Sequence, residues 1–332
     1  MGIFWGNGGV KAVKDIYAGV GGGVKTIKEV YVGQNGVPEL VWRKKSGCFV
    51  CVGEKGKSYY STDGKTWKAM SGLPSNTFTA VAYGSGLFVC VGPVRLSCYS
   101  TDGKTWSAMS GLDSPYVMND VAYGNDRFVC VGNGGRSCYS TDGKNWVAMS
   151  GLTINVFCIA YGNGRFVCVD SAGISYYSTD GENWIAMSEL PGLPSNDYFT
   201  GIAYGNNRYV CISRTGKSYY STDGKTWAVM SALPVLSSNK YFRNVAYGND
   251  SFVCVGDEGK SCYSTDGGTW TAMSGLPSMT FSDIVYGDDR FVCIGNGVGS
   301  YYSTDGKTWS AMNGLASGNY YGVAYGQLPG LY

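Results

Sequence analysis

The sequence lacks histidine and is poor in charged residues, and both features exclude classes of site. Without histidine, the commonest general base and metal ligand is missing. Charged residues make up 15% of the chain and the net charge is +2. Because no basic run accompanies this balance, neither a nucleic acid nor an anionic membrane surface is indicated as a partner. We therefore expect no metal and no cofactor.

Long apolar runs are also missing. No stretch of about 18 apolar residues occurs, so no segment is expected to insert into a membrane. Lys11 and Lys14 interrupt the apolar region that a secretion signal would need near the start of the chain. The sequence thus predicts a soluble protein without a signal peptide.

What the sequence has in abundance is glycine and tyrosine. The 332 residues include 51 glycines and 27 tyrosines. A disordered chain would lack the aromatic residues. This composition is typical of many short strands joined by tight turns.

One motif, Ser-Thr-Asp-Gly-x-x-Trp, occurs seven times at spacings of 38 to 43 residues. A fixed period of this length indicates a solenoid, a propeller or an array, and it outranks any local estimate of secondary structure. The Asp and Trp of the seven copies are Asp63 and Trp67, Asp102 and Trp106, Asp142 and Trp146, Asp180 and Trp184, Asp223 and Trp227, Asp266 and Trp270, and Asp305 and Trp309.

Each copy contains four short apolar or aromatic runs separated by Asn, Asp and Gly. In one copy the runs are 121–124, 128–131, 137–140 and 146–149. This pattern is typical of β-hairpins, and no segment shows helical periodicity over ten or more residues. The sequence predicts an all-β fold, a seven-bladed β-propeller of four-stranded blades over residues 38–332.

The two ends of the repeat array predict how the ring closes. The first copy starts at its second strand, and the chain ends with an unmatched first strand, Val323-Ala324-Tyr325. We expect this strand to become the inner strand of the blade formed by residues 48–70, which would remove a sheet edge. Val41-Trp42 is a second candidate for that place, or for a cap outside the blade, although its sequence does not match the motif.

The segment Ser-Thr-Asp-Gly-Lys-Thr-Trp at residues 61–67 resembles the Asp-box, or BNR, repeat of sialidases and related propellers. It is one residue shorter between Asp and Gly than the usual form, and the resemblance covers residues 48–326. It implies a structural turn joining the outer two strands of each blade. The residue types agree, because Asp accepts hydrogen bonds from a turn, Gly allows positive φ, and Trp packs between blades. We therefore expect these Asp residues to be structural, without a catalytic or metal-binding role.

A sialidase would also need a cluster of arginines around the substrate carboxylate, a tyrosine nucleophile and an acid/base carboxylate. The recurring arginines Arg127, Arg165, Arg208 and Arg290 occupy equivalent places in different repeats, so they cannot converge on one pocket. No pair of carboxylates stands out from the repeat background. The sequence predicts a protein that is not an enzyme.

Seven of the twelve cysteines hold the same place in the second strand of a repeat. Equivalent places on neighbouring blades are usually too far apart for disulfides, and no CxxC pair suits zinc. We expect small buried thiols, which fits assembly in a reducing cytoplasm.

Residues 1–37 form a different unit, in which the segment 10–19 is echoed by 24–33. Each copy alternates as a strand does, and two such strands need a partner to be stable. The pattern resembles a short module of virion and tail proteins from phages and prophages of Gram-positive bacteria. It implies attachment to other virion proteins through residues 1–37, and it is compatible with a homo-oligomer. The alternative is a plain N-terminal β extension.

The loops between the second and third strands vary most, and they share one face with the connections between repeats. The candidate ligand residues on this face are Arg95, Arg136, Arg214, Tyr198 and Tyr241. Aromatic rings beside amide and hydroxyl groups suit sugar recognition. Phe199 and Phe242 in the same connections are expected to pack at the mouth of the barrel instead.

These observations predict a non-enzymatic phage virion protein of the tail or tail tip, assembled in the bacterial cytoplasm. Its propeller would act as an interaction module or bind a host-surface glycan. Three alternatives stay open: a lectin-like bacterial propeller unrelated to phage, a sialidase-type glycoside hydrolase, and a purely architectural role such as head decoration.

Overall fold

The computed structural model describes residues 47–93, 96–109, 112, 117–194, 197–231, 233–234, 237, 239–297 and 299–327, and the backbone of strands between residues 16 and 43. Across these parts the secondary structure is strands, turns and three short 3-10 segments. Within them, no helix is long and apolar enough to cross a membrane.

The chain divides into two units between residues 46 and 47. In the first unit, β1 (Ile16–Val20) pairs with β2 (Gly23–Ile27), and β3 (Glu29–Gln34) pairs with β4 (Val37–Arg43). Val41 and Trp42 thus belong to β4, whose partner strand is β3. The predicted boundary between residues 37 and 38 falls inside β4, whereas the two units divide between residues 46 and 47.

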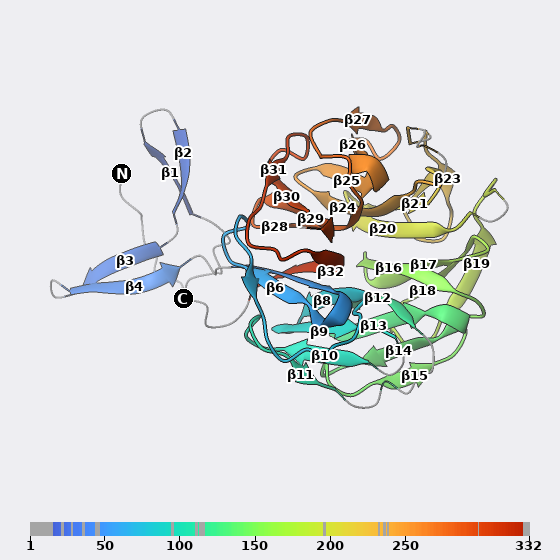
Figure 1. Cartoon of the computed structure of the whole chain (residues 1–332), viewed down its shortest axis with the longest axis horizontal. Coiled ribbons are helices and arrows are strands. Elements are labelled where there is room, and N and C mark those ends of the chain that lie inside the picture. The colour runs from blue at the N-terminus through green and yellow to red at the C-terminus, as the bar shows by residue number, and fades with distance from the viewer. Residues whose placement is uncertain are drawn as a thin grey trace, which may run out of the picture. The chain divides into compact units, whose positions relative to one another are not determined.

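The second unit consists of antiparallel sheets arranged around a common centre (Figure 1). The first strands, nearest the centre, are β8 (Ala80–Gly84), β12 (Met118–Gly124), β16 (Val156–Gly162), β20 (Phe199–Gly205), β24 (Phe242–Gly248), β28 (Phe281–Gly287) and β32 (Gly318–Gly326). The second strands are β5 (Cys48–Gly53), β9 (Leu87–Val91), β13 (Arg127–Gly132), β17 (Arg165–Asp170), β21 (Arg208–Ser213), β25 (Ser251–Gly256) and β29 (Arg290–Gly297). This is the arrangement of a β-propeller.

The outer strands are shorter than the inner ones. The third strands are β6 (Ser58–Ser61), β10 (Ser97–Ser100), β14 (Ser137–Ser140), β18 (Ile174–Ser178), β22 (Ser218–Ser221), β26 (Ser261–Ser264) and β30 (Ser300–Ser303). The fourth strands are β7 (Lys68–Ala69), β11 (Ser107–Ala108), β15 (Val147–Met149), β19 (Ile185–Glu189), β23 (Ala228–Val229), β27 (Thr271–Met273) and β31 (Ser310–Ala311). The 3-10 segments η1 (Glu54–Gly56), η2 (Asn133–Gly135) and η3 (Asp257–Gly259) follow second strands.

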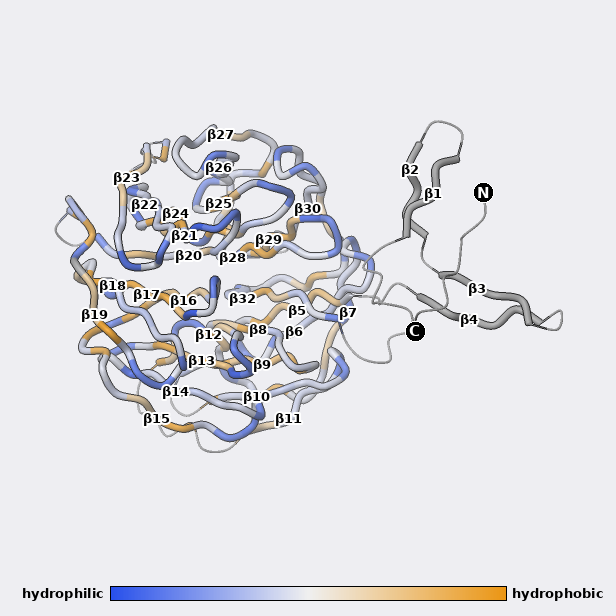
Figure 2. The backbone as a smooth tube through the Cα atoms, turned by 180° about the vertical axis from the view of Figure 1, so that it is seen from behind, coloured by the Kyte–Doolittle hydropathy of each residue, from blue (hydrophilic) through white to orange (hydrophobic). Residues whose placement is uncertain are grey.

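The core lies between consecutive sheets and is built mainly from the second strands. β5 is buried along its whole length, and the other second strands are buried at their Phe or Tyr, Val and Cys positions. All twelve cysteines are buried free thiols. In Figure 2 the hydrophobic stretches follow the inner and second strands, whereas the turns at their ends are hydrophilic. Burial of this apolar surface is the main stabilising contribution to the fold.

The Tyr-Gly pair that ends each first strand connects one repeat to the next. A Cβ atom built on Gly84 would lie 1.9 Å from Cγ of Tyr123, and one on Gly124 would lie 2.0 Å from Cγ of Tyr161. The tyrosine ring of each repeat therefore occupies the space that a side chain would need on the preceding glycine. This contact, rather than a positive φ, explains the glycine.

The C-terminal strand pairs with the start of the second unit. β32 and β5 are antiparallel, with Val323 opposite Cys51, so β32 is the first strand of the sheet that continues through β6 and β7. β32 also pairs briefly with β29, where Asn319 lies opposite Asn296. The predicted place of residues 323–325 beside the strand at residues 48–53 matches this pairing, and the closure of the ring stays a prediction.

Candidate functional site

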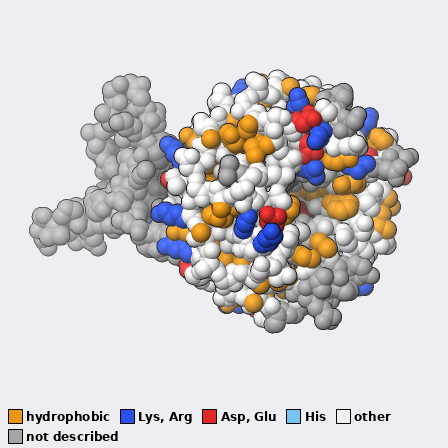
Figure 3. All heavy atoms as spheres, viewed as in Figure 1, with side chains coloured by type: hydrophobic (Ala, Val, Ile, Leu, Met, Phe, Trp, Pro, Cys, Tyr) orange, Lys and Arg blue, Asp and Glu red, His pale blue; other side chains and the backbone are white. Residues whose placement is uncertain are grey.

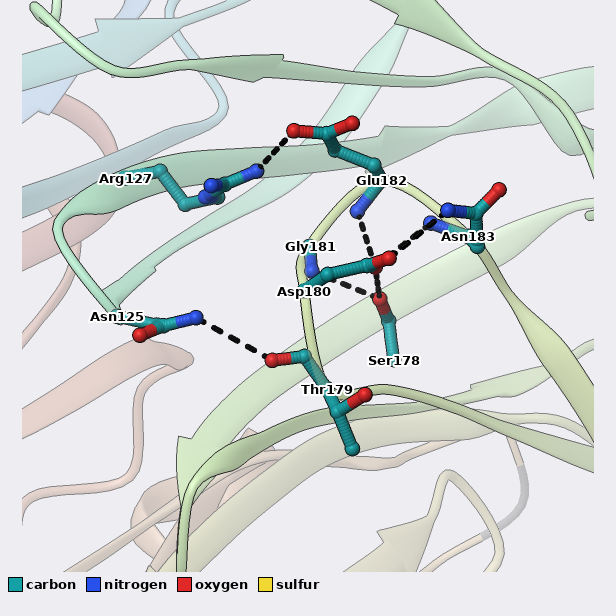
Figure 4. Close-up of polar contacts among 8 residues, drawn as sticks. All are labelled: Asn125, Arg127, Ser178, Thr179, Asp180, Gly181, Glu182 and Asn183. Atoms are coloured by element: carbon teal, nitrogen blue, oxygen red, sulfur yellow. Dashed lines mark hydrogen bonds and ion pairs between the residues drawn. The ribbon is translucent and has the colours of Figure 1, made fainter.

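Each Ser-Thr-Asp-Gly turn is held by its aspartate, and Figure 4 shows the turn of Asp180. The Asp180 carboxylate accepts hydrogen bonds from the backbone N–H groups of Glu182 and Asn183, both at 2.9 Å, and from Oγ of Ser178 at 2.9 Å. Partial burial acts to raise the pKa of Asp180, but these hydrogen bonds outweigh it and lower that pKa. The same backbone bonds are made by Asp63, Asp102, Asp142, Asp223, Asp266 and Asp305. With its acceptor atoms used in this way, the carboxylate stabilises the turn.

The recurring arginines bind the turn of the next repeat. Arg165 and Arg208 donate from Nη1 to the carbonyl oxygens of Asp223 and Asp266, each at 2.6 Å. Arg127 instead pairs with the Glu182 carboxylate at 2.6 Å (Figure 4). These arginines thus join neighbouring repeats on the face that carries the Ser-Thr-Asp-Gly turns, and they do not form a shared pocket.

The opposite face contains a ring of unlike side chains at the start of the first strands. In six of the seven first strands the register shifts two residues before the conserved Val or Ile, as between Met118 and Asp120 in β12. The seventh, β8, begins after that point. The ring residues at this position are Thr79, Asn119, Phe157, Thr200, Arg243, Ser282 and Tyr321. Because a β-bulge re-aims its extra residue, these side chains leave the regular alternation of the strand.

A cavity of about 470 Å³ opens at this ring. Its wall includes ring residues from six repeats and further amide and hydroxyl groups at the ends of second and first strands. The lining residues are Thr79, Asn119, Phe157, Arg243, Thr280, Ser282, Asn296, Asn319 and Tyr321. A concave site with two aromatic rings and several polar groups is the usual form of a small-ligand site.

The cavity wall is polar but nearly neutral. Its cationic side chain, Arg243, donates from Nε and Nη2 to the Asp257 carboxylate, both at 3.0 Å. Asn119 donates from Nδ2 to the carbonyl oxygen of Val156 at 2.8 Å, which fixes its amide. On the face that Figure 3 presents, charged side chains occur in small groups, some of them with both signs, among uncharged and hydrophobic surface. The wall therefore favours hydrogen bonding over attraction of a strongly charged ligand.

Two carboxylates lie one residue further along the first strands. Asp120 accepts hydrogen bonds from its neighbour Val121 at 2.8 Å and from Ile159 of the next repeat at 2.9 Å. Asp283 is bound in the same way by Ile284 at 2.8 Å and Val323 at 2.7 Å. Burial raises the pKa of both groups to about 7. Each carboxylate connects two inner strands.

Beside the cavity, the three predicted ligand residues Tyr198, Arg214 and Tyr241 lie together. The guanidinium carbon of Arg214 is 4.9 Å from the ring centroid of Tyr198 and 5.0 Å from that of Tyr241. Tyr198 also packs on Phe157 of the cavity wall at 4.7 Å, and Arg243 lies 5.4 Å from the Tyr241 ring. We call Tyr198, Arg214 and Tyr241 the Tyr-Arg-Tyr stack; it is continuous with the cavity.

Of the other two predicted residues, the structure places only Arg136, and it lies away from this stack. Arg136 is exposed after η2 in another repeat, and Arg95 lies outside the described residues. Phe199 and Phe242 are fully buried, in agreement with the expectation that they pack. Sequence reasoning missed the ring residues, although a comparison of the seven repeats shows that this position differs from copy to copy while the following Val-Ala-Tyr-Gly hardly changes.

The described residues contain no group of three or more Cys, Asp or Glu side chains placed to hold a metal ion. The cysteines are buried, and the carboxylates near the cavity each accept hydrogen bonds from the protein. The cavity wall presents hydroxyl groups, amide groups and two aromatic rings, and Arg214 lies beside it.

No protein-family model matches this chain, and no curated protein matches it. Solved structures that resemble it are β-propellers. YCF48 bound to D1 peptide has a TM-score of 0.54 and 20% identity, over 71% of this chain and 80% of that chain. A streptogramin B lyase has a TM-score of 0.59 and 12% identity, over 75% of this chain and 90% of that chain. The WD40 β-propeller domain of Doa1 has a TM-score of 0.57 and 11% identity, over 74% of this chain and 84% of that chain. At these identities the likeness shows the fold alone: the chain is a β-propeller.

Proposed function

We propose that this protein is a non-enzymatic binding module, a seven-bladed propeller whose cavity face recognises a glycan on a host surface. The observation that carries the proposal is the ring of unlike side chains around the cavity. The repeats keep the same scaffold residues, yet Phe157, Arg243 and Tyr321 hold equivalent places with different chemistry. A selective binding surface requires a constant scaffold that carries side chains of different chemistry.

Seven blades closed by β32 are part of this proposal. The last and first repeats are joined by the same backbone hydrogen bond as consecutive repeats. The backbone N–H of Trp67 donates to the carbonyl oxygen of Asn313 at 2.8 Å, and the backbone N–H of Trp106 donates to that of Ser71 at 3.0 Å. A closed ring leaves no inner sheet edge and holds the rim side chains in fixed positions.

The carboxylates beside the cavity support a binding role over hydrolysis. Asp120 and Asp283 accept backbone hydrogen bonds with both oxygens, and Asp257 is bound by Arg243. A general acid or nucleophile needs an oxygen directed at the substrate. The fold alone does not decide between binding and catalysis, since one structural neighbour is bound to a peptide and another is a lyase.

A glycan array with the full-length chain tests the binding role. We expect selective binding that falls about tenfold in Phe157→Ala and Tyr321→Ala, because each change removes an aromatic surface from the cavity. Lys225→Gln is the matched control, since Lys225 is exposed on the turn face and packs on Tyr177 at 4.8 Å. No glycan signal, or equal loss in the control, would contradict this role.

We further propose that residues 1–37 attach the protein to a phage tail or tail tip. The support is the echoed segment and its resemblance to modules of Gram-positive phage virion proteins. We expect the full-length chain to co-purify with phage particles released from the producing cells. Particles that lack the chain would remove the virion role and favour a bacterial lectin.

A further inference from the structure

Arg214 packs against two aromatic rings. Its side chain is 26% exposed, and its guanidinium lies within 5.0 Å of the ring centroids of Tyr198 and Tyr241. Packing on aromatic rings restricts the orientation of the guanidinium. Its N–H groups lie in the plane of the guanidinium, so hydrogen bonds form at its in-plane edge.

The carboxylate beside Arg214 is largely used by other groups. Asp197 is buried and accepts hydrogen bonds from the backbone N–H of Tyr198 at 3.0 Å, from Oγ of Ser213 at 2.6 Å and from the hydroxyl of Thr215. Its contact with Nε of Arg214 is 3.8 Å, longer than a hydrogen bond. Asp197 therefore holds Arg214 in place without occupying its terminal nitrogens.

Arg243 provides the contrast within the same face. Nε and Nη2 of its guanidinium donate hydrogen bonds of 3.0 Å to Asp257, so this pair of N–H donors is already occupied. Among the described residues, the terminal nitrogens of Arg214 have no hydrogen-bond acceptor, and its buried Nε has none either. A planar guanidinium with a free edge matches a carboxylate, which accepts two parallel N–H bonds.

From this geometry we infer that Arg214 binds the carboxylate of an acidic saccharide edge-on, beside the rings of Tyr198 and Tyr241. The inference rests on the proposed function and deepens it by naming the ligand class. The acidic group would lie on the Tyr-Arg-Tyr stack, and neutral hydroxyl groups would face the amide and hydroxyl side chains of the cavity. The stack and the cavity are continuous because Tyr198 packs on Phe157 at 4.7 Å.

Saturation-transfer NMR on the full-length protein tests the inference without knowledge of the natural ligand. The probes are D-glucuronate and its neutral counterpart D-glucose, with an acetylated dipeptide acid as a carboxylate of another source. We expect glucuronate to bind and glucose to bind roughly 10- to 100-fold more weakly, the range expected for hydrogen bonds to a charged group. The dipeptide acid should bind less well than glucuronate, because it lacks the ring hydroxyls.

Three variants separate charge from geometry. Arg214→Gln should abolish the preference for glucuronate, and Arg214→Lys should keep only a minor part of it, because an ammonium lacks the planar fork. Lys225→Gln removes the same charge from the opposite face and should leave the preference intact. Thermal melts establish that each variant is folded.

The outcomes distinguish this inference from the proposed function. Equal binding of glucuronate and glucose, or an unchanged preference in Arg214→Gln, overturns the role of Arg214 and leaves neutral glycan binding untouched. Stronger binding of the dipeptide acid overturns the saccharide assignment. If Phe157→Ala loses binding on the glycan array but keeps the preference for glucuronate, both the cavity and the Tyr-Arg-Tyr stack are supported. If the array shows no binding but glucuronate binds through Arg214, only the host-glycan role is contradicted.

Discussion

The ring of Tyr83 packs over Gly326, so that a Cβ atom on that glycine would lie 2.1 Å from Cδ2 of the tyrosine. This contact joins β32, the last strand among the described residues, to the first complete repeat. It has the same form as the contacts of Tyr123 with Gly84 and of Tyr161 with Gly124 between consecutive repeats. One contact type thus continues across the two ends of the repeat array.

Alanine at these glycines should be far more harmful than alanine at a glycine of a turn. In Gly162→Ala the new Cβ would lie 2.0 Å from Cγ of Tyr204, so the ring must move. We expect a loss of unfolding free energy of about 2–3 kcal/mol from overpacking. Gly164→Ala is the control, because nothing lies within 4 Å and only its positive φ costs about 1 kcal/mol. Urea denaturation measures both; equal losses would contradict the packing argument.

The tryptophans should contribute unequally to stability. Trp67 is 3% exposed, and its Nε1 donates to Oγ of Ser300 at 3.1 Å. Trp67→Ala should lower the free energy of unfolding by about 3–5 kcal/mol. Trp227 is only half-buried, and its Nε1 has no partner among the described residues, so Trp227→Ala should cost less. The same ranking in guanidinium denaturation checks this; a reversed ranking would refute it.

Arg290 should stabilise the fold as its equivalents do. Arg290 donates from Nη1 to the carbonyl oxygen of Asp63 at 3.0 Å, across 227 residues of chain. Arg290→Gln should therefore cost about 1 kcal/mol. Arg208→Gln, which breaks the equivalent bond to Asp266, should cost a similar amount. Differential scanning calorimetry of both variants tests this, and an unaffected Arg290→Gln would argue against ring closure.

The turn aspartates should stabilise the protein above their unfolded pKa. Burial acts to raise the pKa of Asp223, but hydrogen bonds from Thr226 and Lys225 prevail and lower it to about 2. Since the folded pKa is depressed, this stability is present above about pH 4 and is lost as the pH falls toward 2. The stability gap between wild type and Asp223→Asn, measured by urea denaturation, should shrink over that interval. A constant gap would show that the charge is not involved.

Asp120 should show the opposite pH dependence. Burial raises its folded pKa to about 7, above the unfolded value, so the wild type loses stability as the pH rises from about 4 to 7. Asp120→Asn cannot ionise, and its amide can accept at only one atom, so it should be less stable at pH 5 with a smaller deficit at pH 8. Urea denaturation at both pH values measures the deficit, and a deficit that grows with pH would contradict the assignment.

Several features of the site depended on contacts that the sequence does not contain. Tyr198, Arg214 and Tyr241 are predicted to share a face, but their stacking follows from three separate loops meeting beside the cavity. The sequence shows that the position of Phe157 and Arg243 varies between repeats. The direction in which these side chains point, however, depends on the bulge in each first strand. The sequence also does not indicate that Cys90 lies opposite Cys98 across two strands of one sheet.

The sequence by itself determined the repeat, the four strands of each copy and the residue types of the turns, because these depend on local periodicity and on hydrogen bonds within a few residues. It also determined that residues 323–325 supply a first strand, since the motif is local. Only the tertiary structure decided which glycine each tyrosine covers, how the recurring arginines join neighbouring repeats, and which side chains surround the cavity. These relationships join residues tens to hundreds of positions apart, and packing around a common centre brings them together.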